Sequence, residues 1–134
     1  MAPTDAGVTG GRKVLCDPPA MAGRVVIFLS HADPAALRLA GACALAAAAL
    51  DDRVDLFLFG PAVAAAVEAA GDPDHPAALL HRARAAGRCR LLACSASAVA
   101  EGVDLGRAES ALDAVVGWPT VLEWSRGVVD RFFF

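Results

Sequence analysis

Cysteines are the residues of this chain whose type and position offer the most chemistry. There are four, namely Cys16, Cys43, Cys89 and Cys94. Cys94 ends the short apolar run Cys89–Cys94, and small residues follow it. This pattern predicts a strand that ends at Cys94 and a helical turn that begins at Ser95. Free backbone N–H groups and the positive end of the helix dipole would then face the Cys94 sulfur, open to a partner, and favour its thiolate form.

A thiolate at this point could attack sulfur and then hold a persulfide anion. Position alone leaves a second interpretation open, in which Cys94 is a small buried apolar residue at a strand end. Three other cysteine chemistries are excluded by their partner positions. A Cys-x5-Arg phosphatase loop needs arginine where Ala100 stands, and a rhodanese-like loop needs arginine at Val99. A thioredoxin-type pair needs cysteine at Ser97.

Three polar residues are auxiliary candidates beside Cys94. Ser95 and Ser97 follow it directly. His31 follows the first predicted strand, and it shares a rim with Cys94 if the first and third strands are neighbours. There it could polarise the thiol or move a proton. The alternative for His31 is an exposed loop residue.

The other residues offer few further candidates for catalysis or ligand binding. Cys43 lies among alanines and is expected to pack inside a helix, whereas Cys89 is expected to be structural, with a resolving role left open. There is no Cys-x-x-Cys pair and no histidine pair at i, i+4, so we expect no metal site. No Gly-rich loop follows the first strand, so we expect no nucleotide cofactor. Trp118, Trp124 and the closing residues 132–134 are expected to form core or subunit contacts.

Alternating strand and helix patterns must position these residues. Strands are predicted at residues 25–29, 53–59, 89–94, 115–116 and 128–134. Helices are predicted at about 34–50, 61–70, 76–86, 95–101 and 107–114, and from 118 onward. Asp33 is the predicted N-cap of the first helix, with Pro34 in its first position. That helix is apolar nearly all round, so it should be buried or packed in an assembly. The alternation predicts an α/β domain with a mostly parallel five-stranded sheet and helices on both faces.

Length, charge and hydropathy limit the class of protein. The chain has 134 residues, which suits one domain, here residues 24–134 preceded by an arm at residues 1–23. A net charge of −3 argues against a nucleic-acid or anionic-membrane partner. The longest apolar stretch, residues 37–50, is too short to span a bilayer. With no basic, apolar leader at the start, we expect a cytoplasmic protein with reduced thiols.

The segment Leu91-Leu-Ala-Cys-Ser-Ala-Ser-Ala-Val-Ala-Glu-Gly-Val103 resembles the active-site segment of DsrE/DsrF-like and TusD-like sulfur-relay proteins. In that family an apolar strand ends in a cysteine, a small-residue turn follows, and a Gly-Val pair comes soon after. The order of strands and helices before this segment is similar to that of the family as well. It comprises the run Val25–Leu29, the Ala-rich first helix and the run Val54–Gly60. The ending Val129-Asp-Arg-Phe132 looks like the closing strand of the family.

The resemblance implies a three-layer α/β/α sandwich that assembles as a homo-oligomer, either a trimer or a hexamer. It implies that Cys94 carries sulfane sulfur as a persulfide between donor and acceptor proteins, with no metal or organic cofactor. Two alternatives stay open beside the sulfur carrier or sulfurtransferase. One is a non-catalytic oligomeric module that binds a partner or small ligand at the carboxyl edge of the sheet. The other is a thiol redox sensor that pairs Cys94 with Cys89 or Cys16 of another subunit.

Overall fold

The computed structural model describes residues 23–134. Apart from Gly23, the arm expected at residues 1–23 lies outside the described residues, and so does Cys16. No helix in the described part of the chain is both long enough and apolar enough to cross a bilayer.

A single parallel sheet organises the described chain. Its order is β4-β3-β2-β1-β5, and every neighbouring pair is parallel. The strands are β1 (Arg24–Leu29), β2 (Arg53–Leu58), β3 (Cys89–Cys94), β4 (Ala114–Val116) and β5 (Asp130–Phe133). The predicted five-stranded parallel sheet is therefore confirmed. All the strands point the same way, so their carboxyl ends share one edge, where ligands of open α/β sheets gather.

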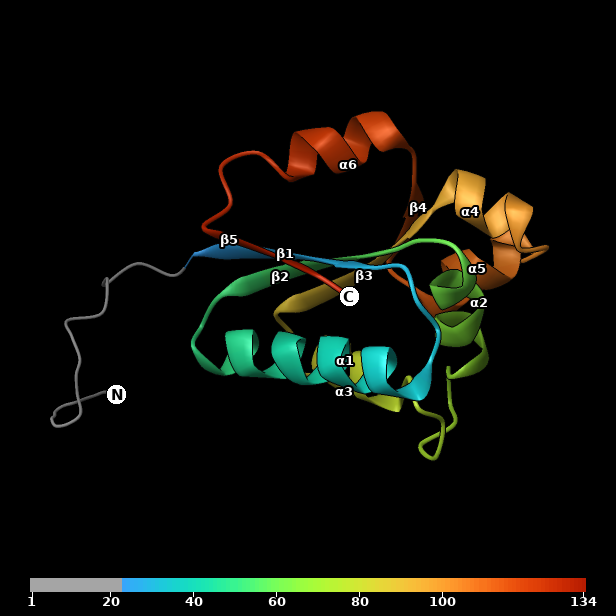
Figure 1. The fold of residues 1–134 in the computed structure, drawn as a ribbon, viewed down its shortest axis with the longest axis horizontal. Helices are drawn as coiled ribbons and strands as arrows, with labels where there is room; N and C mark the ends of the chain where they lie inside the picture. The colour runs from blue at the N-terminus through green and yellow to red at the C-terminus, as the bar shows by residue number, and fades with distance from the viewer. Residues whose placement is uncertain (1–22) are drawn as a thin grey trace, which may run out of the picture.

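Helices cover both faces of the sheet unequally. They are α1 (Pro34–Ala49), α2 (Pro61–Glu68), α3 (Ala78–Ala85), α4 (Ser95–Ala100), α5 (Leu105–Ala111) and α6 (Trp118–Trp124). In Figure 1, α1 and α3 lie below the sheet and α6 lies above it, while α2, α4 and α5 gather at the end where the strands finish. The three-layer α/β/α architecture expected from the sequence is confirmed.

Local capping explains where the helices begin. The Asp33 carboxylate accepts a hydrogen bond from the Ala36 N–H at 3.1 Å, and Pro34 opens α1 as predicted. The expectation for α5, at about residues 107–114, is wrong by a few residues. Asp104 caps this helix by accepting from the Arg107 N–H at 3.1 Å, so the helix begins at Leu105.

The apolar core has two unequal parts because alternate strand residues face opposite sides of the sheet. The larger part lies on the α1 and α3 side and contains Ile27, Leu56 and Leu91. The smaller part lies against α6 and contains Val26, Phe57, Leu92, Val116 and Val121. One short helix covers this second side, so part of its aromatic surface stays exposed.

Candidate functional site

Cys94 ends β3 at the carboxyl edge of the sheet. Its backbone is still extended, with φ −70° and ψ 123°, and α4 begins at the next residue. Its strand neighbour on β4 is Val116. The predicted change from strand to helix at Cys94 is therefore confirmed. Because strand residues two apart share a face, the Cys94 side chain lies on the same side of the sheet as Leu92, the side of α6.

Cys94 is buried, whereas the sequence predicted a thiol open to a partner. The residue is 3% exposed. Its strand, β3, has β2 on one side and β4 on the other. Cys94, the last residue of β3, still pairs with Val116 of β4, so it lies within the sheet and not on an edge strand. Its side chain also makes no capping hydrogen bond with the first turn of α4. The expectation of an exposed sulfur held by backbone N–H groups is therefore wrong for this conformation.

The other described cysteines are less suited to chemistry. Cys89 lies at the opposite end of β3 and belongs to the larger apolar cluster. Burial, with smaller contributions from the Asp113 and Asp55 carboxylates, raises the pKa of the Cys89 thiol to about 12. Burial also raises the pKa of Cys43, which packs against the same cluster from α1. Cys94 belongs to neither apolar cluster of the described residues, although it is buried.

Strand order separates His31 from Cys94. β2 lies between β1 and β3, so the condition that their strands are neighbours is not met. Two strand spacings put the strand ends about 10 Å apart. His31 is exposed, and its Nδ1 lies 3.3 Å from Ser30 Oγ. This structure therefore does not support His31 as a group that polarises the Cys94 thiol or moves its proton. Ser95 and Ser97 follow Cys94 in the first turn of α4.

A charged cluster that was not predicted from the sequence anchors α6 to the sheet. Asp55 is 7% exposed and accepts two hydrogen bonds from Arg90, at 2.8 and 3.0 Å, and one from Arg24 at 3.3 Å. Arg24 also donates to the carbonyl oxygens of Trp124 and Arg126. The Arg90 guanidinium lies 4.4 Å from the ring centroid of Trp124. A carboxylate inside the otherwise apolar run of β2 was the signal that could have revealed this cluster.

An aromatic groove lies beside α6, on the same side of the sheet as Cys94. It encloses about 620 Å³. Its lining residues are Phe28, Ser30, Phe59, Trp118, Val121, Leu122, Ser125, Arg126, Arg131 and Phe133. Phe59 follows β2 directly, and β2 is the strand beside β3, so one end of the groove lies one strand away from Cys94. Trp118 and Phe133 are 52% and 72% exposed, so they are not core residues of the single chain, and the expectation of a subunit contact stays a prediction.

Comparison with protein families shows to which family this chain belongs. The model of the DsrE/DsrF-like family matches residues 23–124, which is most of the chain. The chain belongs to the DsrE/DsrF-like family. A comparison with curated proteins returned no match. Within this DsrE/DsrF-like chain, the match covers Cys94 and the whole sheet except β5.

Proposed function

We propose that this chain carries sulfane sulfur as a persulfide on Cys94 and passes it between partner proteins. The observation that carries the proposal is a cysteine at the carboxyl edge of the sheet, outside both apolar clusters, in a chain of the DsrE/DsrF-like family. The other described thiols are poorer candidates, because Cys89 and Cys43 pack against the larger cluster and burial raises the pKa of each.

The chemistry is two successive exchanges with no net oxidation. The Cys94 thiolate attacks the outer sulfur of a donor persulfide, so a bond forms between Sγ and that sulfur while the S–S bond of the donor breaks. The donor leaves as a thiolate. An acceptor thiolate then attacks the outer sulfur on Cys94, and Cys94 leaves as the thiolate. The Cys94 proton passes to solvent before loading and is regained after release.

Burial of Cys94 adds a requirement to this proposal. At 3% exposure, its sulfur cannot meet a donor unless neighbouring groups move. The element beside it is short, since α4 has six residues. Short helices with few buried contacts open at low cost, on faster timescales than global unfolding. We therefore propose that α4 moves when a donor docks at the carboxyl edge.

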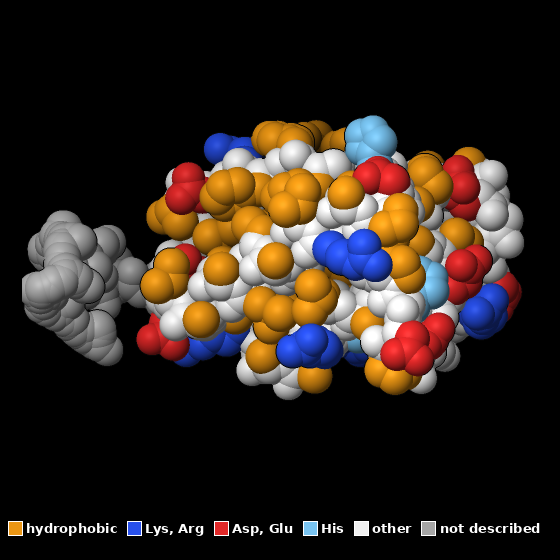
Figure 2. Space-filling model, turned by 60° about the horizontal axis from the view of Figure 1, so that its bottom comes forward, with side chains coloured by type: hydrophobic (Ala, Val, Ile, Leu, Met, Phe, Trp, Pro, Cys, Tyr) orange, Lys and Arg blue, Asp and Glu red, His pale blue; other side chains and the backbone are white. Residues whose placement is uncertain are grey.

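The outer surface of α1 supports self-association as a trimer or hexamer. Exposed apolar residues recur on it at spacings of four and three, namely Ala35, Leu39, Ala42, Ala46 and Ala49. Figure 2, which views the molecule from the α1 and α3 side, shows hydrophobic side chains over much of this face, interrupted by separate charged groups. Such a stripe suits packing against a helix of another copy.

We further propose a cytoplasmic protein in which residues 1–23 form an arm before the domain.

The burial of Cys94 favours a second candidate function. A thiol that stays covered would make this chain a non-catalytic, oligomeric member of the family that binds a partner or ligand at the carboxyl edge. The two functions differ in one observable, which is whether Cys94 gains sulfur.

Mass spectrometry after incubation with a persulfide donor tests the relay. The wild type should gain one sulfur atom, located by peptide mapping on Cys94. Cys94→Ser should gain none there, while the matched variants Cys43→Ser and Cys89→Ser should load like the wild type. A wild type that stays unmodified at a donor concentration that loads a small-molecule thiol would refute the relay and leave the binding module.

A further inference from the structure

The aromatic groove beside α6 has a floor of four stacked rings. Neighbouring ring centroids lie 5.1 Å apart for Phe59 and Trp118, 6.0 Å for Phe28 and Phe59, and 4.9 Å for Phe28 and Phe133. The floor thus runs across the ends of β2, β1 and β5. The outer ring surfaces stay open, since Trp118 is 52% exposed and Phe133 is 72% exposed. A floor of this kind favours a flat or chain-like apolar body.

One wall of the groove is α6, and its position is fixed. Val121 is fully buried against the sheet, whereas Leu122 is 59% exposed beside the groove. The hydrogen bonds of Arg24 to the carbonyl oxygens of Trp124 and Arg126 hold the end of α6 to β1. The groove is therefore formed before any ligand arrives, as small-molecule pockets usually are. Its volume of about 620 Å³ falls in the range that such pockets occupy.

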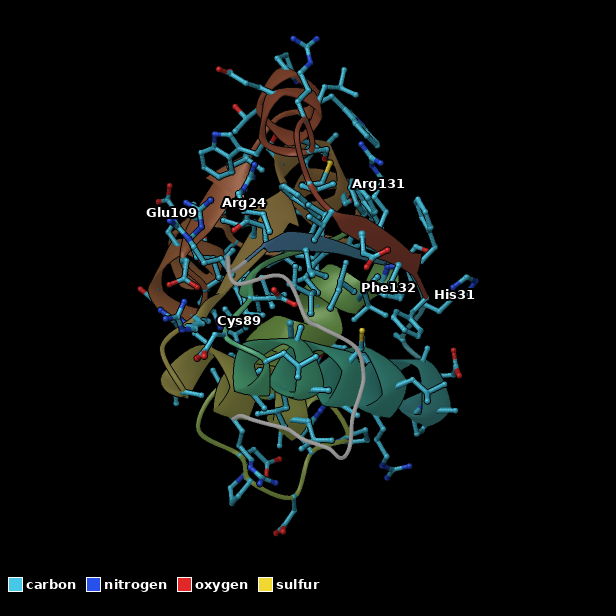
Figure 3. All side chains as sticks on the ribbon, turned by 90° about the vertical axis from the view of Figure 1, so that its left-hand side faces the viewer. Arg24, His31, Cys89, Glu109, Arg131 and Phe132 are labelled. Atoms are coloured by element: carbon cyan, nitrogen blue, oxygen red, sulfur yellow. The ribbon has the colours of Figure 1, made fainter. Side chains whose placement is uncertain are left out.

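Two arginines give the groove its charge. Arg126 follows α6, and Arg131 lies on β5, whose odd and even residues face opposite sides of the sheet. Figure 3 shows Arg131 directed toward the α6 side and Phe132 directed away from it. Arg131 donates to the Ser125 carbonyl oxygen at 3.1 Å, and within residues 23–134 the other N–H groups of its guanidinium have no recorded partner. Among the described residues, no carboxylate pairs with either arginine, and none lines the groove.

We propose that this groove binds a small amphipathic anion, with an apolar aromatic or aliphatic body on the ring floor and one carboxylate-like head at Arg126 and Arg131. A cationic ligand would meet two guanidinium groups and no lining acid. A neutral apolar ligand would leave the arginine end without a partner. Arginine binds planar anions such as carboxylates with paired hydrogen bonds, which favours the anion. This site is separate from the sulfur relay because it does not use Cys94.

Two fluorescent probes that differ by one anionic group test the proposal. They are 8-anilinonaphthalene-1-sulfonate and its neutral counterpart N-phenyl-1-naphthylamine, each titrated into the full chain. The wild type should bind the sulfonate more tightly. The double variant Arg126→Gln/Arg131→Gln should raise the Kd of the sulfonate about tenfold and change the Kd of the neutral probe less than twofold. Decanoate should displace the sulfonate, and decan-1-ol should displace it poorly.

Matched variants separate this site from surface charge and from the relay. Arg38→Gln/Arg107→Gln removes the same charge at exposed positions outside the groove, and should bind both probes like the wild type. Leu122→Glu places a negative charge at the groove wall and should weaken the sulfonate. Cys94→Ser should bind normally whether or not the relay is real. Thermal unfolding of each variant shows that it is folded.

Three results would overturn the proposal. The first is equal binding of the sulfonate to the wild type and to the groove double variant. The second is equal loss in the Arg38→Gln/Arg107→Gln control. The third combines two observations: the wild type binds neither probe, and Leu122→Glu dissociates the oligomer. Together they would mean that a second copy of the chain covers the groove.

Discussion

The pKa of Cys89 makes a quantitative prediction about stability in alkaline solution. Burial, followed by the carboxylates of Asp113 and Asp55, raises this pKa from its ordinary value of 9.0, which the unfolded chain keeps, to about 12. From about pH 9 upward the unfolded chain therefore releases a proton that the folded chain keeps. The free energy of unfolding then falls as pH rises, because the contribution of a group whose folded pKa is raised is complete only below its unfolded pKa.

The size of the effect follows from the shift. One pH unit corresponds to about 1.4 kcal/mol for a single proton, and the unfolded thiol is only partly ionised at pH 9, so Cys89 should lower the free energy of unfolding by about 2 kcal/mol between pH 9 and pH 11. This chain suits the measurement because it has no tyrosine and one lysine, Lys13, so apart from its cysteines few side chains titrate in that range. Urea unfolding at pH 8, 9, 10 and 11 measures it.

The comparison with Cys89→Ala isolates the thiol. That variant should be less stable at pH 8, yet it should lose much less stability than the wild type between pH 9 and pH 11. Cys43→Ala is the matched comparison, because it removes a half-buried thiol and keeps Cys89. Burial raises the pKa of Cys43 as well, but only that of Cys89 is raised as far as about 12, so Cys43→Ala should lose a smaller part of the pH dependence than Cys89→Ala. Parallel curves for the wild type and Cys89→Ala would refute the reasoning. They would return Cys89 to consideration as a reactive or resolving thiol.

Three further substitutions test the packing. Asp55→Ala should lower the free energy of unfolding by about 2 kcal/mol in urea, because Arg90 loses two charged hydrogen bonds, and nearly unchanged stability would contradict this. Gly41→Ala should destabilise by about 1 kcal/mol despite better helix propensity, because the added Cβ would lie 2.5 Å from Leu79 Cβ; a raised Tm would contradict this. Leu39→Glu should dissociate the oligomer in sedimentation velocity, whereas an unchanged mass would exclude this face of α1.

Much of the fold could be predicted because the local signals agree. The run Val25–Leu29 is continuously apolar and β-branched, as a strand covered on both faces should be, and Asp33 with Pro34 marks a helix start. The beginning of α5 was missed because Gly106 weakens the helical pattern while Asp104 supplies the cap. Capping by a single carboxylate is hard to distinguish from a loop when the residues after it are poor helix formers.

The candidate site was predicted less completely, because its properties are tertiary. The position of Cys94 at a strand end follows from local pattern, but its burial depends on β4 pairing with β3 up to that residue. The separation of His31 from Cys94 depends on strand order, which no local pattern encodes. The aromatic groove unites residues from β1, β5 and α6 with Phe59, and the sequence presents these as unrelated apolar positions.

The proposed relay requires that Cys94, although covered, both accepts and releases sulfur. The most direct measurement uses a single-cysteine chain, Cys16→Ser/Cys43→Ser/Cys89→Ala, loaded with radiolabelled sulfur from a persulfide donor and then treated with cyanide. We expect about one labelled sulfur per chain, recovered as thiocyanate, and none from the same chain with Cys94→Ser added. Label that fails to load onto the folded chain, or that loads equally without Cys94, would contradict it.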